Sequence, residues 1–252
     1  MRIAFIYKYF PSLGGAERVM TVLANEFVEK GVEIVIYSFQ QELDQPAYLL
    51  DKAISILPLP DKRKIASSMN VDYLSNDLIK NEISILLNHD TISDSMLLCK
   101  KVKEKTGIPL ITLHHGQIYL PYSSLFSIVC IKQGFNIRKA LFPLYYLYVL
   151  VRECLHHKKN IRICDAYVVL SSSFQRQLGS SSKIQAIGNP LSYSSFFDMS
   201  QYDKKENVVV MVGRISEFHK RFSLALKIWQ KIETNPAFSS WNFEIVGDGS
   251  DL

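Results

Sequence analysis

Short apolar runs alternate with amphipathic stretches along most of this chain. Each apolar run has about the length of one β-strand. Residues 15–31 and 96–105 instead carry apolar side chains at the spacing of a helix face. The predicted strands are residues 2–7, 32–39, 53–59, 82–88, 108–116, 165–173 and 182–190. Because strands that alternate with helices return to their sheet through right-handed crossovers, this pattern predicts an α/β fold with a doubly wound, mainly parallel sheet.

The alternation stops between residues 191 and 207, where serine, proline and charged residues show no period. A further strand, helix and strand follow within residues 208–252. We therefore predict a first domain over residues 1–190, a linker over residues 191–207 and a second domain that begins at residue 208. Since a unit of ~40 residues rarely supports its own core, we expect this second domain to be incomplete.

Composition narrows the class of protein further. With 48% hydrophobic and 21% charged residues the chain is a foldable globular protein, and its net charge of +5 gives little support for a nucleic-acid partner. Residues 1–10 lack the cleavage site of a secretory signal, and they match the first strand. The cysteines show no metal-ligand spacing, which favours a reducing, cytoplasmic location. They are Cys99, Cys130, Cys154 and Cys164.

Two adjacent glycines, Gly14 and Gly15, separate the first predicted strand from the first predicted helix. Without side chains they let a ligand approach the N–H groups at the positive end of the helix, and they equally suit a tight turn that binds nothing. The GxGxxG spacing is absent and the second strand does not end in an acidic residue, which argues against an NAD-dependent dehydrogenase. The lack of GxxxxGK[ST] and GxSxG argues against a P-loop NTPase and an α/β-hydrolase.

Histidines and cations follow two other predicted strands. His114 and His115 end residues 108–116, and since neighbouring strand residues point to opposite faces, we expect His115 to face the ligand cleft and His114 to pack. The alternative is that His115 has no ligand and is simply packed or solvent-facing. Arg214 and Lys220 follow the apolar run at residues 208–212. Cations at the carboxyl edge of a parallel sheet suit a phosphate group.

Residues 140–151 contain no charged residue, and basic residues flank them on both sides. A helix of this length cannot span a bilayer, which takes ~20 residues. With its aromatic body and basic flanks, the segment 138–159 can lie on an anionic membrane surface. It can equally be a core helix with solvated ends. The sequence leaves both interpretations open.

Taken in order, these elements resemble family 4 of the retaining, nucleotide-sugar-dependent glycosyltransferases, and the likeness runs over nearly the full chain. The motifs are GGAER, a strand that ends in His-Gly, VVLSSSFQRQL, KIQAIGNPLSYSSF, VVMVGRISEFHKRFSLALKIW and WNFEIVGDGSDL. The resemblance implies the GT-B fold of two facing Rossmann-like domains. Family members carry a Glu-x7-Glu element beyond the point where this sequence stops, so the resemblance also implies a chain truncated within its C-terminal nucleotide-binding domain.

The resemblance assigns roles to single residues. It implies that Gly14 and Gly15 approach the donor, that His115 lies beside the transferred sugar as the catalytic candidate, and that Asn189 and Pro190 form the interdomain hinge. It further implies that Arg214 and Lys220 hold the donor diphosphate. Gly247 and Gly249 would line the nucleotide side of the cleft.

The chemistry of the reaction agrees with these residue types. A nucleotide sugar leaves as a diphosphate that gains negative charge, and fixed cations stabilise that charge as it develops. The sequence has no Asp-x-Asp motif, and an Arg-Lys pair can replace a divalent cation in this role. We therefore expect no metal and no cofactor, with a UDP- or GDP-linked sugar as substrate.

The leading hypothesis is a glycosyltransferase of cell-surface polysaccharide or lipid-linked glycan synthesis, which acts on a glycan or lipid-linked acceptor. We expect it to be cytoplasmic and peripheral to the inner face of the membrane. The alternative is a catalytically inactive acceptor- or membrane-binding module, because half of the expected donor site is missing. A nucleotide-sugar epimerase or dehydrogenase is disfavoured, since the fingerprint glycines and acid are absent.

Overall fold

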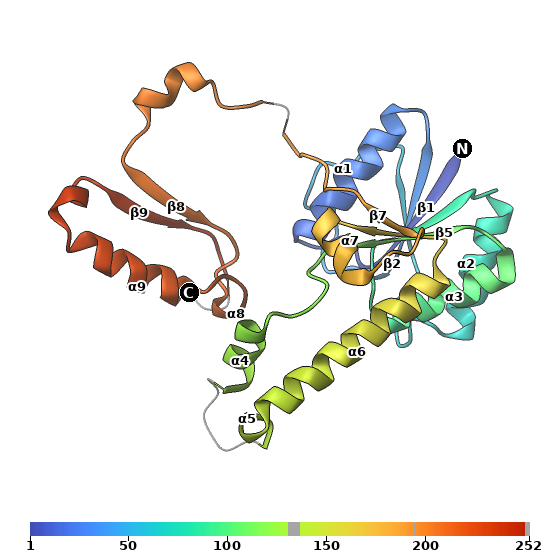
Figure 1. The fold of residues 1–252 in the computed structure, drawn as a ribbon. Helices are drawn as coiled ribbons and strands as arrows, with labels where there is room; N and C mark the ends of the chain where they lie inside the picture. The colour runs from blue at the N-terminus through green and yellow to red at the C-terminus, as the bar shows by residue number, and fades with distance from the viewer. Residues whose placement is uncertain (131–136, 194, 250–252) are drawn as a thin grey trace. The chain divides into compact units, whose positions relative to one another are not determined.

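The computed structural model describes residues 1–130, 137–193 and 195–249 (Figure 1). Contacts between Cα atoms divide the chain into two compact units, Met1–Ser192 and Tyr193–Leu252. Each unit is described by itself.

The first unit is built on a parallel sheet of seven described strands in the order β3-β2-β1-β4-β5-β6-β7 (Figure 1). Every strand overlaps an apolar run predicted from the sequence, and the predicted α/β fold class is confirmed. The strand order reverses between β1 and β4, and ligands of such sheets bind outside the carboxyl ends of the strands at this switch point. The strands are β1 (Arg2–Tyr9), β2 (Glu33–Gln40), β3 (Ser55–Pro58), β4 (Ile85–Asn88), β5 (Leu110–His114), β6 (Ala166–Val169) and β7 (Ile184–Ala186).

Helices cover both faces of this sheet. Helix α1 (Gly15–Glu29) buries Met20 and Ala24 against one face, which Phe5, Ile36 and Leu87 help to form. The opposite face carries the larger core, to which several helices contribute. These helices are α2 (Ser68–Lys80), α3 (Ser93–Thr106), α6 (Phe142–Ile163) and α7 (Ser172–Leu178). A parallel sheet covered on both faces explains why its strands are apolar throughout.

Helix α6 continues well past the sheet (Figure 1). Its C-terminal half joins the main core through Ile161, whereas its N-terminal half packs on α4 (Tyr122–Cys130). A small separate cluster around Leu125, Phe142 and Val149 holds this contact together. The short helix α5 (Ile137–Ala140) precedes α6.

The second unit contains two parallel strands, β8 (Val208–Val212) and β9 (Asn242–Val246), among its described residues. Trp229 of α9 stacks on Phe243 with ring centroids 5.4 Å apart. Both strands remain largely exposed, and Val212 keeps 70% of its surface accessible. The segment predicted as a linker contains a 3-10 helix, η1. The remaining elements are η1 (Met199–Lys204), α8 (Glu217–Lys220), α9 (Phe222–Glu233) and η2 (Pro236–Phe238).

Candidate functional site

The predicted glycine pair lies at the switch point, between β1 and α1. Gly14 is the N-cap of α1 with extended backbone, and its carbonyl accepts a hydrogen bond from the Tyr48 hydroxyl at 3.0 Å. A Cβ atom at this position would overlap the carboxylate of Glu17, whereas a Cβ atom at Gly15 would meet no atom within 4 Å. The absence of a side chain at Gly14 therefore lets the Glu17 carboxylate pack against it, and Gly15 leaves open space at the start of the helix.

Glu17 is a buried carboxylate in the first turn of α1, with 7% of its surface exposed. Its Oε1 accepts hydrogen bonds from Ser12 Oγ at 2.8 Å and from the Tyr7 hydroxyl at 3.1 Å. Burial first, and then the charge of Glu17, raises the pKa of Tyr7. The sequence GGAER was interpreted as a glycine motif only, and no role was predicted for Glu17. An acidic residue in the first turn of a predicted helix, next to a glycine turn, was the available signal.

His115 follows β5 at the same edge and pairs with a second histidine. Its Nε2 lies 3.1 Å from Nδ1 of His89, and the two rings stack with centroids 5.3 Å apart and planes at 10°. Burial lowers the pKa of His115 to about 4, with a smaller contribution from His114, and burial holds the pKa of His89 well below its usual value. Both rings are therefore neutral at pH 7. His89 was not predicted as a site residue, although it directly follows a predicted strand, just as His114 and His115 lie at the end of another.

His114 has other partners. Its Nε2 lies 3.0 Å from the carbonyl oxygen of Gln117 and its Nδ1 lies 3.3 Å from Thr91 Oγ1. Since a carbonyl only accepts, Nε2 carries the proton and the threonine hydroxyl donates to Nδ1. The ring also stacks on Tyr167, with centroids 6.2 Å apart.

A small cavity of about 60 Å³ brings several predicted residues together at this edge. His115 lines it with both candidate hinge residues, Asn189 and Pro190, and His114 lines it as well. The structure thus places His115 next to residues 187–190, which follow β7.

Three of the four predicted nucleotide-binding residues of the second unit, Arg214, Gly247 and Gly249, lie in neighbouring loops, and Lys220 ends the short helix α8. A Cβ atom at Gly247 would overlap the carbonyl oxygen of Gly213, and one at Gly249 would overlap that of Ile215. The ladder continues past the strands through a hydrogen bond from the Gly213 amide to the Val246 carbonyl, at 3.0 Å. Both glycines therefore permit close contact between the loops after β8 and β9.

Lys220 lies beside the same loop. Its Cε would be 3.4 Å from a Cβ atom on Gly213, so its aliphatic chain covers this glycine. Gly213 has a positive φ of 156°, a backbone conformation that favours glycine. Arg214 follows directly and is exposed, as Lys220 is. The structure thus brings both predicted cations to the carboxyl end of β8.

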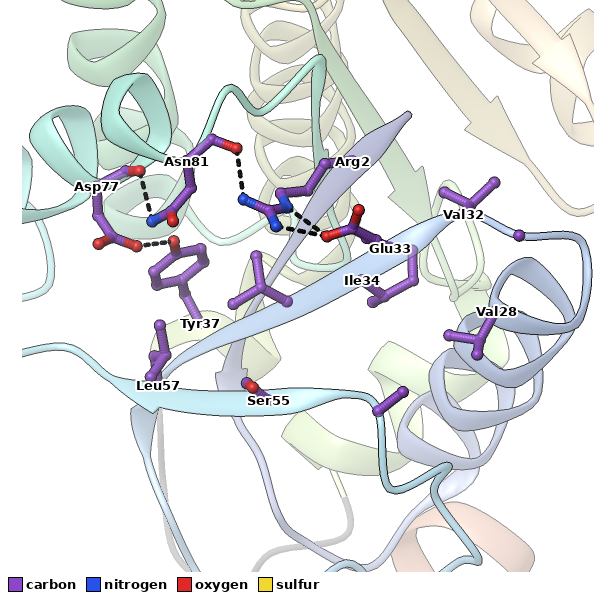
Figure 2. Close-up of a pocket in the computed structure, with 13 residues that line it drawn as sticks. Arg2, Val28, Val32, Glu33, Ile34, Tyr37, Ser55, Leu57, Asp77 and Asn81 are labelled. Atoms are coloured by element: carbon purple, nitrogen blue, oxygen red, sulfur yellow. Dashed lines mark hydrogen bonds and ion pairs between the residues drawn. The ribbon is translucent and has the colours of Figure 1, made fainter.

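A larger cavity, of about 490 Å³, opens at the opposite, amino-terminal edge of the first sheet (Figure 2). Its polar groups pair with one another: the Arg2 guanidinium donates to Glu33 at 2.8 Å and to the Asn81 carbonyl at 2.9 Å, and the Tyr37 hydroxyl bonds Asp77. Burial and the bond to Asp77 raise the pKa of Tyr37. Because ligands of parallel sheets bind at the carboxyl edge, we do not place the substrate here.

Helices α4, α5 and α6 carry a row of exposed apolar side chains, which we call the α4–α6 surface. On α6 they recur at helical spacing, and its buried Phe142 and Val149 lie on the side that packs on α4. The surface consists of Tyr122, Phe126, Ile137, Leu141, Leu144, Leu147, Tyr148, Val151 and Leu155. The exposed cations Lys158 and Lys159 follow it on α6, and the side chain of Arg138 lies outside the described residues. No helix in the described part of the chain is long and apolar enough to cross a bilayer.

The described side chains form no group of three or more histidine, cysteine, aspartate or glutamate residues that could hold a metal ion. The free cysteines Cys99 and Cys164 are buried, and burial raises their thiol pKa values. Neither thiol is therefore a candidate nucleophile.

The first unit is a doubly wound α/β protein with glycine and histidine turns at the carboxyl edge of its sheet, and its fold is shared with solved structures. The lipopolysaccharide outer core galactosyltransferase WaaB superposes with a TM-score of 0.62 at 20% identity, over 100% of this chain and 62% of that one. Anabaena HepE, solved with UDP and glucose, superposes with a TM-score of 0.60 at 13% identity, over 98% and 61%.

The family model described as Glycosyltransferase Family 4 matches residues 13–192, which is more than half of the chain, so this chain belongs to glycosyltransferase family 4. This confirms the family expected from the ordered motifs. A relative from Campylobacter jejuni is 24% identical over 99% of this chain and 62% of its own length. It is named GalNAc-alpha-(1->4)-GalNAc-alpha-(1->3)-diNAcBac-PP-undecaprenol alpha-1,4-N-acetyl-D-galactosaminyltransferase. The chain thus spans less than two thirds of the length of these relatives.

Proposed function

We propose that this protein transfers a sugar, with retention of configuration, from a UDP- or GDP-linked donor to a glycan or lipid-linked acceptor of surface polysaccharide synthesis. The observation that carries the proposal is the family match over the unit that holds Gly14, Gly15 and His115 at one switch point. Two similar proteins support the classes of substrate. The Campylobacter relative acts on an undecaprenol-linked glycan, and HepE was solved with UDP-glucose.

In this proposal the first unit contributes open space and a neutral ring. Gly15 leaves room at the start of α1, where backbone N–H groups point at a ligand and the helix dipole favours negative charge. His115 is half-buried and neutral, so it can hydrogen-bond a sugar hydroxyl or a phosphate oxygen without adding charge.

Arg214 and Lys220 of the second unit would hold the diphosphate as charge develops on it. Two fixed cations at the end of β8 can do so without a metal ion, and we propose that the reaction uses neither metal nor cofactor. Gly247 and Gly249 would line the nucleotide side, and Asn189 with Pro190 would act as the hinge. The tight contacts of both GDG glycines mean that their first role is to keep the two loops together.

We further propose that the α4–α6 surface lies on the anionic inner face of the cytoplasmic membrane. Its apolar side chains are exposed over three helices, and Lys158 and Lys159 follow it on α6. Apolar burial combined with attraction to anionic lipids is how interfacial helices bind.

The second candidate function is an inactive acceptor- or membrane-binding module. The observation in its favour is that the chain spans 62% of its relatives, with the strands of the second unit exposed. Donor hydrolysis and sugar transfer should be measured on this chain and on a version extended through the downstream reading frame. Activity in the extended version supports the enzyme, whereas membrane binding with inactivity of both versions supports the module.

A further inference from the structure

The strand order brings together two histidines that are far apart along the chain. His89 is the first residue after β4 and His115 the first after β5, and the two strands are neighbours in the sheet. The 3.1 Å contact between His89 Nδ1 and His115 Nε2 is a hydrogen bond with one donor and one acceptor. Nothing in the chemistry assigned to His115 so far uses this second ring.

This hydrogen bond couples the two tautomers. A neutral imidazole carries one N–H, so donation by His89 Nδ1 leaves His89 Nε2 bare and puts the His115 proton on Nδ1. Donation in the other direction puts an N–H on His89 Nε2 and leaves His115 Nδ1 bare. Both outer nitrogens are buried without a hydrogen-bond partner among the described residues. One of the two is therefore an unpaired N–H, and the other is an unpaired lone pair.

The depth of each ring decides between these arrangements. His89 is 2% exposed and its ring lies 4.8 Å from that of Phe5, in apolar surroundings. His115 is only half-buried and lines the small cavity next to Asn189. An unpaired N–H is tolerated less well in a protein interior than an acceptor without a partner. The proton is therefore better placed on His115 Nδ1, in the less deeply buried ring, than on His89 Nε2.

We propose that His89 is a positioning residue that donates from Nδ1 to His115 Nε2 and so holds His115 as its Nδ1–H tautomer. This Nδ1 nitrogen of His115 is buried in the structure, and an oxygen of the nucleotide-sugar substrate that reaches it on binding meets a hydrogen-bond donor, not a base. The substrate class rests on the function proposed above, whereas the tautomer is a property of this chain without any ligand.

The test is a two-bond ¹H–¹⁵N correlation spectrum of the ¹⁵N-histidine-labelled chain at pH 7, without substrate. Loss of signals in His115→Asn and His89→Phe identifies the two rings. We expect both rings as Nδ1–H tautomers, with pyrrole-type Nδ1 and pyridine-type Nε2 shifts. An Nε2–H tautomer at either ring overturns the proposal.

The His89→Phe variant tests the positioning role, because phenylalanine keeps an aromatic ring between Phe5 and His115 and removes the donor. We expect His115 to lose its single tautomer and to become a mixture or Nε2–H. The control is His156→Gln, since His156 Nε2 lies 2.7 Å from the Thr91 carbonyl and makes no bond to His115 among the described contacts. An unchanged Nδ1–H tautomer in His89→Phe overturns the role of His89.

If His89→Phe does not fold, the wild-type spectrum still decides, since the proposal requires the Nδ1–H tautomer on both rings. Failure of the wider function is separable from failure of this proposal. Absence of nucleotide-sugar binding in calorimetry contradicts the function and leaves the tautomers as measured.

Discussion

The hydroxyl of Ser12 donates a hydrogen bond to the buried carboxylate of Glu17 at 2.8 Å, and this contact ties the loop after β1 to the first turn of α1. The same carboxylate takes the Tyr7 hydroxyl at 3.1 Å. Glu17 thus fixes the shape of the turn that holds Gly14 and Gly15. Its removal should lower the stability of the first unit and change the shape of this turn.

We expect Glu17→Ala to lower the free energy of unfolding of the first unit by about 1–3 kcal/mol, because it leaves buried hydroxyls without their acceptor. Glu17→Gln keeps an acceptor oxygen, so its free energy of unfolding should fall by less than that of Glu17→Ala. Urea unfolding followed by circular dichroism measures the change. Glu29→Ala, on the exposed C-terminal end of the same helix, is the control. An equally small effect of Glu17→Ala and Glu29→Ala would contradict the structural role of this acid.

A pH dependence of stability follows from His115. Its folded pKa of about 4 lies below the usual value of about 6.5, so between these two values the unfolded chain binds a proton that the folded chain does not. The free energy of unfolding should therefore fall as the pH falls from about 6.5 to 4, by up to about 1.4 kcal/mol per pH unit for this group. His115→Gln removes this contribution. Between pH 7 and pH 5 the free energy of unfolding of the wild type should therefore fall relative to that of this variant, with a slope of up to about 1.4 kcal/mol per pH unit. Parallel curves of unfolding free energy against pH would contradict the lowered pKa of His115.

Arg214→Ala and Lys220→Ala, each made in a version extended through the downstream reading frame, should weaken the binding of nucleoside diphosphate. The loss of one charged hydrogen bond to phosphate costs on the order of 1.5–3 kcal/mol, or more than tenfold in affinity. Titration calorimetry with UDP and GDP measures this loss. Lys231→Ala, in the exposed last turn of α9, should leave the affinity unchanged. Unchanged affinity in both site variants would remove the diphosphate assignment.

Binding of the α4–α6 surface to lipid can be measured by sedimentation with liposomes. The bound fraction should rise with anionic lipid and fall with salt, because salt screens the cations beside this surface. Leu144→Glu and Leu147→Glu should weaken binding, since both side chains are exposed on this surface. Leu49→Glu is the control, as Leu49 is 91% exposed and lies elsewhere. If the bound fraction depends on neither lipid charge nor salt, the α4–α6 surface more readily packs in a core or contacts another protein.

The second unit should unfold before the first. Strand β1 is paired on both sides, by β2 and β4, whereas the described part of the second unit pairs β8 only with β9. Amides of Val208 to Val212 should therefore exchange hydrogen much faster than those of Ile3 to Tyr7. Both tryptophans, Trp229 and Trp241, belong to the second unit, so tryptophan fluorescence should change at lower urea than circular dichroism. Equal protection of both strands in a monomer would show that this unit is stable alone.

The sequence predicted the strands of both units well, because an apolar run and the turn residues that bound it are local properties of the chain. It was less informative about α2 and α4, which were not predicted as separate elements. The segment 138–159 illustrates the limit. Its apolar residues predicted either a membrane surface or a core helix, and in α6 they do two things: Phe142 and Val149 pack on α4, while Leu144 and Leu147 are exposed.

The sequence by itself determined the α/β class, the glycine turn at Gly14 and Gly15, and the placing of His115 and Lys220 after strands, since each follows from residue type and local period. Only the tertiary structure decided which of these groups meet. His89 and His115 are hydrogen-bonded because β4 and β5 are neighbours, and Glu17 reaches Tyr7 because α1 folds back on β1. Strand order and helix docking depend on contacts across the whole core, and these contacts carry no periodic signal along the chain.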